Sequence, residues 1–433
     1  MSILIDNKTP KSLIIDNKTV ATIYINDKLA WSAEEPFPEI DPNGPLTFIK
    51  TDAGEGSIQL KQYGTPLYSK TFQINKNDTG WEVYDIENTP VTMNKGDVLQ
   101  IKSTSNNAIS SSSSKYRYFT TVGKYLCGGQ TASLCNNTMY IQTVYTWYRL
   151  FKGTNIITAP KVIAYAQRSG SETFMNCKYL VDASNVLSRD YYAAIGTYGC
   201  ESMFEGCVAL TKPPVFNNPK LPEGYCNRMF FGCTSLVNAP ELHATTLAPN
   251  CYQRMFFGCT SLVNAPELPA NVLGDSCYNY MFYNCKSLVN APELPATILT
   301  SNCYSGMFST CTSLVNAPEL PATTLAQNCY NSMFNNCTSL EVSPKIYAET
   351  ITNTSNVNYM FSGCTKLKEI YCNARYSSGT TEITTTIGVN WLNSVPDASD
   401  CIFHKNPDWA GPTSRDVNTI PSNWQIVDWI DAA

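Results

Sequence analysis

The residues best suited to chemistry in this chain of 433 residues are its cysteines, of which there are 18. Most of them fall on two ladders, and most repeats of the sequence hold one member of each ladder. Six or seven other residues separate the two cysteines of one repeat and no histidine accompanies them, which argues against a tetrahedral zinc site. A free cysteine packs as a small apolar side chain, so we predict reduced structural thiols, with disulfides between the ladders as the alternative. The first ladder is Cys207, Cys233, Cys259, Cys285, Cys311, Cys337 and Cys364, and the second is Cys200, Cys226, Cys251, Cys277, Cys303 and Cys329.

Two more rows of side chains recur at the same interval, one of glutamates and one of tyrosines. Carboxylates stacked one repeat apart, at roughly 5 Å, repel each other, so they must face water, a cation or a basic partner. Rows of tyrosine can bind sugar rings or protein surfaces, and half-buried packing is the alternative. We treat as the candidate binding surface Glu241, Glu267, Glu293, Glu319, Tyr252, Tyr278, Tyr304 and Tyr330. A row of asparagines instead predicts a ladder of side-chain hydrogen bonds: Asn238, Asn264, Asn290 and Asn316.

No catalytic constellation stands out in the sequence. The two histidines, His243 and His404, lie far apart and lack evident partners. The chain contains no Gly-x-Ser-x-Gly elbow, no phosphate-binding loop and no His-Glu-x-x-His motif. A converging carboxylate pair of the glycosidase kind stays open as an alternative, because any two carboxylates could meet in the fold. We predict a protein that is not an enzyme and that uses no cofactor and no metal.

Composition narrows the range of partners. Charged residues make up 15% of the chain, against roughly 25% in an average soluble protein. The net charge of −5 and the lack of a basic run argue against nucleic-acid binding. No apolar stretch reaches the roughly 18 residues of a membrane span, so we expect no membrane insertion. The first residues do not resemble a secretory signal, and reduced cysteines suit assembly in a cytoplasm.

The cysteine ladders belong to a repeat that occupies residues 146–373. Met-Phe recurs at an interval of 26 residues five times and then of 27, and degenerate copies begin the array at Phe151 and Phe174. One unit cannot bury its own leucines but stacked units can, which predicts a solenoid. The Cys-Tyr-x-x-Met-Phe stretch has helical character, whereas Val-Asn-Ala-Pro-Glu-Leu suits a short strand. With the first cysteine ladder, the predicted core consists of Phe204, Phe230, Phe256, Phe282, Phe308, Phe334, Phe361, Leu210, Leu236, Leu262, Leu288, Leu314, Leu340 and Leu367.

The remaining regions show strand patterns, so we predict a mainly β chain with short helices. Residues 1–31 repeat an Ile-Asp-Asn-Lys-Thr unit between apolar runs, which is typical of a small β-meander. Residues 32–45 are rich in proline and indicate a linker. Residues 46–145 alternate polar and apolar side chains between turn clusters, which predicts an immunoglobulin-like β-sandwich. We expect residues 374–433 to close the solenoid as a C-terminal cap.

The motif Phe230-x-x-Cys233-x-x-Leu236 and its copies resemble the core of BspA-type leucine-rich repeats. The sequence departs from the commoner form by placing Met-Phe where Ala-Phe is usual, and by using 26 residues where about 23 are commoner. The resemblance implies a right-handed leucine-rich-repeat solenoid of 26-residue coils. Such repeats occur in bacterial surface adhesins and also in phage proteins.

Three further segments look like parts of structural proteins from phages of gut Bacteroidetes, including crAss-like phages: residues 28–31, 118–124 and 391–424. The resemblance implies a bacteriophage virion protein, such as a tail fibre, head fibre or decoration protein, made in the host cytoplasm and displayed on the particle. Residues 1–31 would contact other virion proteins, and the solenoid would attach to a host-surface protein or glycan. A homo-oligomer, for example a trimer, is expected. The alternatives are a BspA-like adhesin of a bacterial cell surface and a purely architectural virion component.

Overall fold

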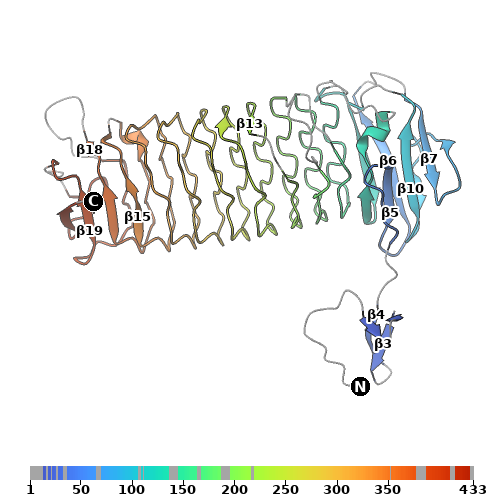
Figure 1. Cartoon of the computed structure of the whole chain (residues 1–433), viewed down its shortest axis with the longest axis horizontal. Helices are drawn as coiled ribbons and strands as arrows, with labels where there is room; N and C mark the ends of the chain where they lie inside the picture. Colours follow the sequence, from blue (N-terminus) through green and yellow to red (C-terminus); the bar gives the residue numbers. More distant parts are fainter. Residues whose placement is uncertain are drawn as a thin grey trace. The chain divides into compact units, whose positions relative to one another are not determined.

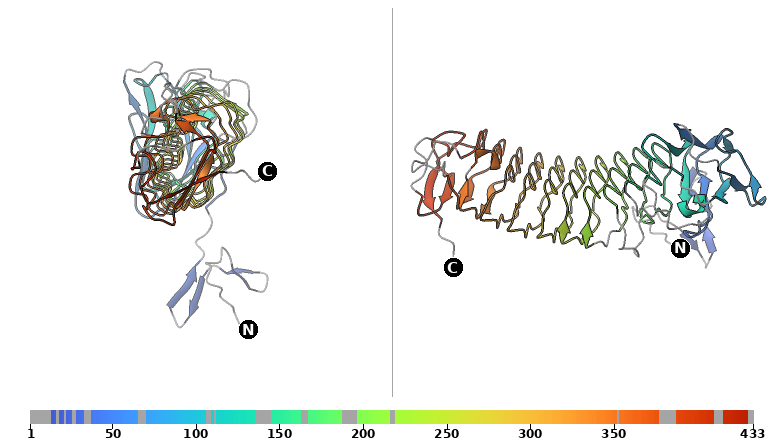
Figure 2. Two further views of the ribbon diagram at one scale, coloured as in Figure 1. Left: turned by 90° about the vertical axis from the view of Figure 1, so that its left-hand side faces the viewer. Right: turned by 90° about the horizontal axis from the view of Figure 1, so that it is seen from above.

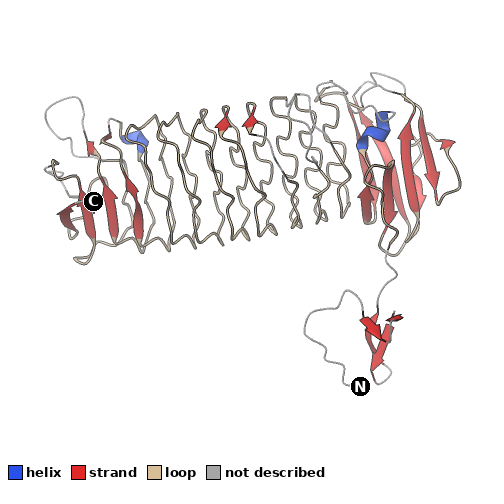
Figure 3. Ribbon diagram, in the orientation of Figure 1, coloured by secondary structure: helices blue, strands red, loops and turns tan. Residues whose placement is uncertain are grey.

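The computed structural model describes residues 13–15, 18–20, 22–25, 28–32, 37–64, 70–105, 109–110, 112–135, 145–162, 167–186, 196–215, 219–351, 353–376, 387–409 and 415–429. The chain divides into two compact units, Met1–Ile40 and Asp41–Ala433. The chain is mainly β, as predicted (Figure 3). The only helices in the described residues are two short 3-10 helices, η1 (Thr131–Cys135) and η2 (Thr354–Asn356).

The first unit contains two antiparallel hairpins. Strand β1 (Leu13–Ile15) pairs with β2 (Lys18–Val20), and β3 (Thr22–Ile25) pairs with β4 (Lys28–Ser32). No ladder joins β2 to β3 within the described part of this unit. The Asp/Asn turn residues at 16–17 and 26–27 lie outside the described residues.

The second unit begins with two antiparallel sheets packed face to face. One sheet has the order β12-β5-β10-β7-β8 and the other β11-β6-β9. Ile58 and Leu60 of β6 point inward and are completely buried, and the rings of Phe48 and Phe119 join the two sheets at a centroid distance of 5.2 Å. The strands are β5 (Leu46–Lys50), β6 (Gly56–Tyr63), β7 (Phe72–Lys76), β8 (Glu82–Val83), β9 (Val91–Met93), β10 (Val98–Ser103), β11 (Tyr116–Val122) and β12 (Tyr125–Gly128).

The stacked coils continue directly from these sheets. Tyr125 of β12 forms a parallel bridge with Ile156, and the amide of Phe119 in β11 donates to the carbonyl of Leu150 at 2.7 Å. The ring of Phe119 stacks on Phe151 at 5.4 Å, which makes one hydrophobic core continuous from the sheets into the first coil. The sheets therefore close one end of the coil stack (Figure 1).

Each coil pairs with the next through short parallel contacts on two of its sides. Isolated bridges such as Asn238 to Asn264 lie on one side, and β13 (Lys220–Leu221) pairs with β14 (Thr246–Leu247) on another. The coils superimpose when the stack is viewed along its length (Figure 2, left). This repeated parallel pairing is that of a β solenoid.

The third side of each coil is a run of turns, and the predicted helical character of Cys-Tyr-x-x-Met-Phe is wrong. Backbone amides alternate between two acceptors: Phe231 donates to Arg228 in its own coil at 3.1 Å, and Phe230 donates to Met255 of the next coil at 2.9 Å. Every fourth residue has a positive φ, as at Arg228 (55°) and Gly232 (71°). Type II turns need such a residue at their third position, whereas a right-handed helix cannot continue through it.

Beyond the turns, the last coils carry longer strands. A four-stranded parallel sheet has the order β15-β17-β19-β20 and extends the solenoid past residue 373 (Figure 1). Phe361, the last member of the phenylalanine ladder, contacts Trp391 at a centroid distance of 6.1 Å, and Trp391 is completely buried. The strands are β15 (Val342–Ile346), β16 (Thr350–Ile351), β17 (Glu369–Cys372), β18 (Arg375–Tyr376), β19 (Ile402–Lys405) and β20 (Gln425–Asp428).

Candidate functional site

The interior of the solenoid consists of the three predicted core ladders. Every phenylalanine, leucine and cysteine of these ladders has an exposed fraction of 0%. Phe230, Phe256 and Phe282 stack nearly parallel at 5.6 Å, and Phe151 and Phe174 extend the same column toward the sheets. The ladders thus form the core of the coil stack and are unavailable to a partner.

The cysteines of the first ladder are hydrogen-bond donors. The Sγ atom of Cys259 donates to the carbonyl oxygen of Phe230 in the preceding coil at 3.1 Å. Burial raises the pKa of Cys259 to about 12, so the thiol keeps its proton at neutral pH. All 18 cysteines are buried and unpaired, and no group of three or more His, Cys, Asp or Glu in the described residues could hold a metal ion. The same Sγ-to-carbonyl bond occurs at Cys207, Cys233, Cys285, Cys311, Cys337 and Cys364.

The tyrosine row is buried, so the prediction that it belongs to a binding surface is wrong. Tyr278 and Tyr304 each have an exposed fraction of 1%, and their rings stack at 5.8 Å. Tyr252 and Tyr330 extend this column at 6.0 and 6.3 Å. The reason lies in the turns: burial along residues 251–259 alternates two in and two out, and the Cys-Tyr pair occupies an inward pair.

The glutamate row faces water, on a bridged side of the coil. The side chain of Glu241 is 83% exposed and lies 3.4 Å from His243 Nε2, and that of Glu319 is 58% exposed and 4.0 Å from Lys345 Nζ. Glu267 and Glu293, between them, are also exposed. Because these carboxylates are exposed, solvent and salt screen the repulsion between neighbouring side chains.

Two rows accompany the glutamates on this side. Asn264 Nδ2 donates to Asn238 Oδ1 at 2.7 Å, and the same bond joins Asn316 to Asn290. A row of valines is exposed by 38–46%, which leaves apolar surface in water along four coils. We call these three rows together the glutamate face. Its valines are Val237, Val263, Val289 and Val315.

A second candidate surface, which the sequence analysis missed, covers the runs of turns. We call it the turn face: the outward side chains of residues 145–153, 167–176, 197–206, 223–232, 249–258, 275–284, 301–310, 327–336 and 357–363. Half-buried rings of Phe231, Phe257 and Tyr283 stack on it at 4.5 and 4.4 Å. The residue after each Met-Phe pair could have indicated this surface in the sequence. It is aromatic in these three repeats but is Ser309 and Asn335 in the next two.

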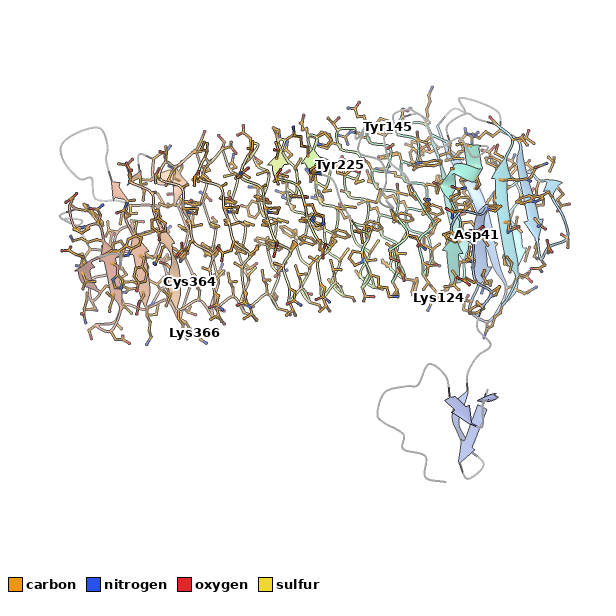
Figure 4. All side chains as sticks on the ribbon, in the orientation of Figure 1. Asp41, Lys124, Tyr145, Tyr225, Cys364 and Lys366 are labelled. Carbon is orange, nitrogen blue, oxygen red and sulfur yellow. The ribbon has the colours of Figure 1, made fainter. Side chains whose placement is uncertain are left out.

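A second aromatic cluster lies where the first coil meets the sheets. Tyr63 of β6 and Tyr116 of β11 are opposite partners in register, and their rings stack at 5.1 Å. Tyr63 is 54% exposed, and Tyr116 also contacts Tyr148 of the first coil at 5.3 Å. Figure 4 shows Tyr145 and Tyr225 along one margin of the stack, opposite Lys124 and Lys366.

Three arginines on the turn face, Arg149, Arg168 and Arg228, are paired with glutamates of adjacent coils. Arg149 Nε lies 2.9 Å from Glu172, which also accepts from Lys152 at 2.7 Å and from the Tyr148 hydroxyl at 3.0 Å. Burial alone would raise the pKa of Glu172, but the hydrogen bonds from Arg149 and Lys152 outweigh it and lower that pKa. This part of the turn face is consequently a charged, hydrogen-bonded surface with aromatic neighbours.

No protein-family model matches the chain, and no curated protein is significantly similar to it in sequence. Among the described residues, no helix is long and apolar enough to cross a membrane. The function of the chain therefore has to be argued from the geometry of its two outer faces.

Proposed function

We propose that the chain is a non-enzymatic adhesion protein of a bacteriophage particle, a tail fibre, head fibre or decoration protein, that binds host-surface protein or glycan through its solenoid. One observation carries this proposal. Buried side chains of the chain itself occupy the interior of the solenoid, whereas the outer faces present rows of side chains at an interval of one coil. Rows of this kind bind through many weak contacts, and several copies on one particle multiply their effect.

The finer fold assignment belongs to the same proposal. The buried Phe-x-x-Cys-x-x-Leu ladders support a BspA-type leucine-rich-repeat solenoid of right-handed coils. Two antiparallel sheets packed through Phe48 and Phe119 support an immunoglobulin-like sandwich at its start. In this arrangement the sandwich is a rigid base and the solenoid is the presented part.

The first 31 residues are the proposed anchor to other virion proteins. They belong to a compact unit of their own, and isolated two-stranded hairpins are in general marginally stable in water. Docking onto a partner would stabilise them. A homo-oligomer, for example a trimer, would bring several solenoids to one position on the particle surface.

The experiment is cryo-electron microscopy of purified particles of the phage that encodes the chain, together with adhesion of the recombinant chain to host cells. The proposal expects residues 1–31 clamped to the particle, the solenoid in solvent, and adhesion that a chain lacking the solenoid cannot reproduce. A solenoid packed against other virion proteins would contradict it in favour of an architectural component. A chain missing from particles but present on bacterial cells would contradict it in favour of a bacterial adhesin.

A further inference from the structure

Arg254 differs from the other arginines of the turn face. Arg149, Arg168 and Arg228 each form an ion pair, with Glu172, Glu201 and Glu205 respectively. Arg254 forms no ion pair with any described residue, although it occupies the same left-handed turn position, 26 residues after Arg228. Among the described turn-face arginines it is the one that lacks a carboxylate.

The guanidinium of Arg254 is partly withdrawn from water without compensation. Its Nε atom is buried and has no hydrogen-bond partner in the described structure, while the side chain as a whole is half-buried. The guanidinium carbon lies 5.7 Å from the centroid of the Tyr280 ring, a distance at which a cation–π interaction is weak. Because burying part of a cation costs free energy unless a partner compensates, a carboxylate arriving from outside would gain more here than at a fully hydrated arginine.

The surroundings of Arg254 define which carboxylate fits. The stacked rings of Phe231, Phe257 and Tyr283 cover one another's faces, so their edges are the parts available to a ligand. Aromatic edges carry partial positive charge and add to the attraction for an anion. Arg254 is linked to these rings through Tyr280, whose ring contacts that of Tyr283 at a centroid distance of 5.7 Å. Gln253, the residue before Arg254, lies in a hydrogen-bonded amide row in which its Nε2 donates to Asn279 Oδ1 at 3.4 Å. Amides next to aromatic rings and one arginine suit hydroxyl groups around a single carboxylate.

We infer that this strip, defined as Phe231, Gln253, Arg254, Phe257 and Tyr283, binds a carboxylate-bearing sugar of an acidic polysaccharide, with the carboxylate on Arg254. The inference rests on the proposed adhesion function and specifies its ligand class and its face. A nucleic acid fits less well, because its phosphates need several unpaired cations and the strip offers one. An acidic peptide is the competing macromolecule, and the test below separates it from a sugar.

The test measures binding of the full chain to polygalacturonate, to neutral dextran and to poly-glutamate by biolayer interferometry at low salt. We expect binding to polygalacturonate and none to dextran. Arg254→Gln should raise the dissociation constant about tenfold, as the loss of one charge-assisted pair implies. Lys286→Gln is the matched control, because it removes the same charge from an exposed side chain outside the strip, and it should change the constant less than about twofold.

Three results would overturn the inference: no binding to polygalacturonate, equal binding to poly-glutamate, or equal losses for Arg254→Gln and Lys286→Gln. Thermal unfolding of each variant verifies that a loss of binding does not come from unfolding. The outcome is distinguishable from failure of the proposed function. A chain that adheres to host cells equally well as wild type and as Arg254→Gln retains the adhesion function but loses this ligand assignment, whereas a chain that neither adheres to cells nor occurs in particles loses the proposed function.

Discussion

The two phenylalanines of one Met-Phe-Phe sequence show how differently the interior and the turn face of the solenoid are constrained. Phe256 belongs to a column of identical rings that runs through every coil at about the same spacing, 5.6 Å on both of its faces. Phe257 belongs to an outer column that is aromatic in three coils and then changes to Ser309. Each interior ring must fit the rings above and below it, whereas an outer side chain need only tolerate the turn backbone. Variation between repeats is therefore free to accumulate outside, on the surface that we propose binds a partner.

The largest effect that sharpens this comparison is expected at alkaline pH. Burial raises the pKa of interior thiols, to about 12 for Cys259 and Cys311 and to about 11 for Cys303. In the unfolded chain a thiol ionises near pH 8.5. Stability from these groups is thus fully present below about pH 8.5 and is lost as pH rises toward 12. Denaturant unfolding followed between pH 7 and 11 should show a falling midpoint; a constant midpoint would contradict the buried, protonated ladder.

Replacing one interior ring should cost more than replacing an aromatic ring of the turn face. Phe256→Ala removes a completely buried ring, and we expect a loss of about 3–5 kcal/mol in the free energy of unfolding. Phe257→Ala, the adjacent control, should lose about 1 kcal/mol, because it gives up mainly ring stacking at the surface. Denaturant unfolding of both variants measures the difference. Similar losses would mean that the outer column is part of the core after all.

Two glycines of the turns allow the energetic cost of a left-handed backbone to be measured separately from that of a collision between coils. Gly363 and Gly258 both have positive φ, 80° and 73°. An added Cβ at Gly363 would collide with the Asn336 side chain, whereas at Gly258 it would make only an ordinary contact with the Gly232 backbone, at 3.9 Å. Gly258→Ala should cost about 1–2 kcal/mol from the left-handed backbone alone. Gly363→Ala should cost about 1–3 kcal/mol more, from the collision. Adding Asn336→Gly to Gly363→Ala should recover that extra loss, and an absent recovery would contradict the close approach.

The smallest effect concerns the thiol as a donor. Cys259→Ala removes the bond to the Phe230 carbonyl and should lower the free energy of unfolding by about 1 kcal/mol. Cys259→Ser keeps a hydrogen-bond donor on the same Cβ atom, so this variant should be more stable than Cys259→Ala. A serine variant that is less stable than the alanine variant would show that cysteine serves here only as apolar filling.

Sequence reasoning predicted the stacking of the repeats and the buried columns of the Phe-x-x-Cys-x-x-Leu motif. The interval between Met-Phe pairs was enough to foresee the stacked solenoid and the buried columns through Phe230, Cys233 and Leu236. Every ring in such a column has the same environment, so its spacing carries the information directly.

The turns escaped prediction because their burial pattern has a period of four, two residues in and two out, which is neither helical nor that of a strand. The stretch was therefore expected to be helical, and Tyr252 was assigned to a candidate binding surface although it belongs to an inward pair. One local signal was available. The residue before most first-ladder cysteines is Gly or Asn, as at Gly232, Gly258 and Asn284, and these two residue types tolerate a positive φ best. The unpaired state of Arg254 was not accessible, since it depends on which coils supply glutamates to their neighbours.

The most direct test of the central claim, that the interior holds the fold while the turn face binds, is one variant carrying Phe231→Ser, Phe257→Ser and Tyr283→Ser. These changes install on three coils the residue type that Ser309 already provides at the same position. Adhesion to host cells and thermal unfolding would be measured on the same preparation. The account predicts a cooperative unfolding transition within a few degrees of wild type and a loss of adhesion of tenfold or more, about 1.4 kcal/mol or more. Full adhesion with the aromatic column removed, or collapse of the fold, would contradict it.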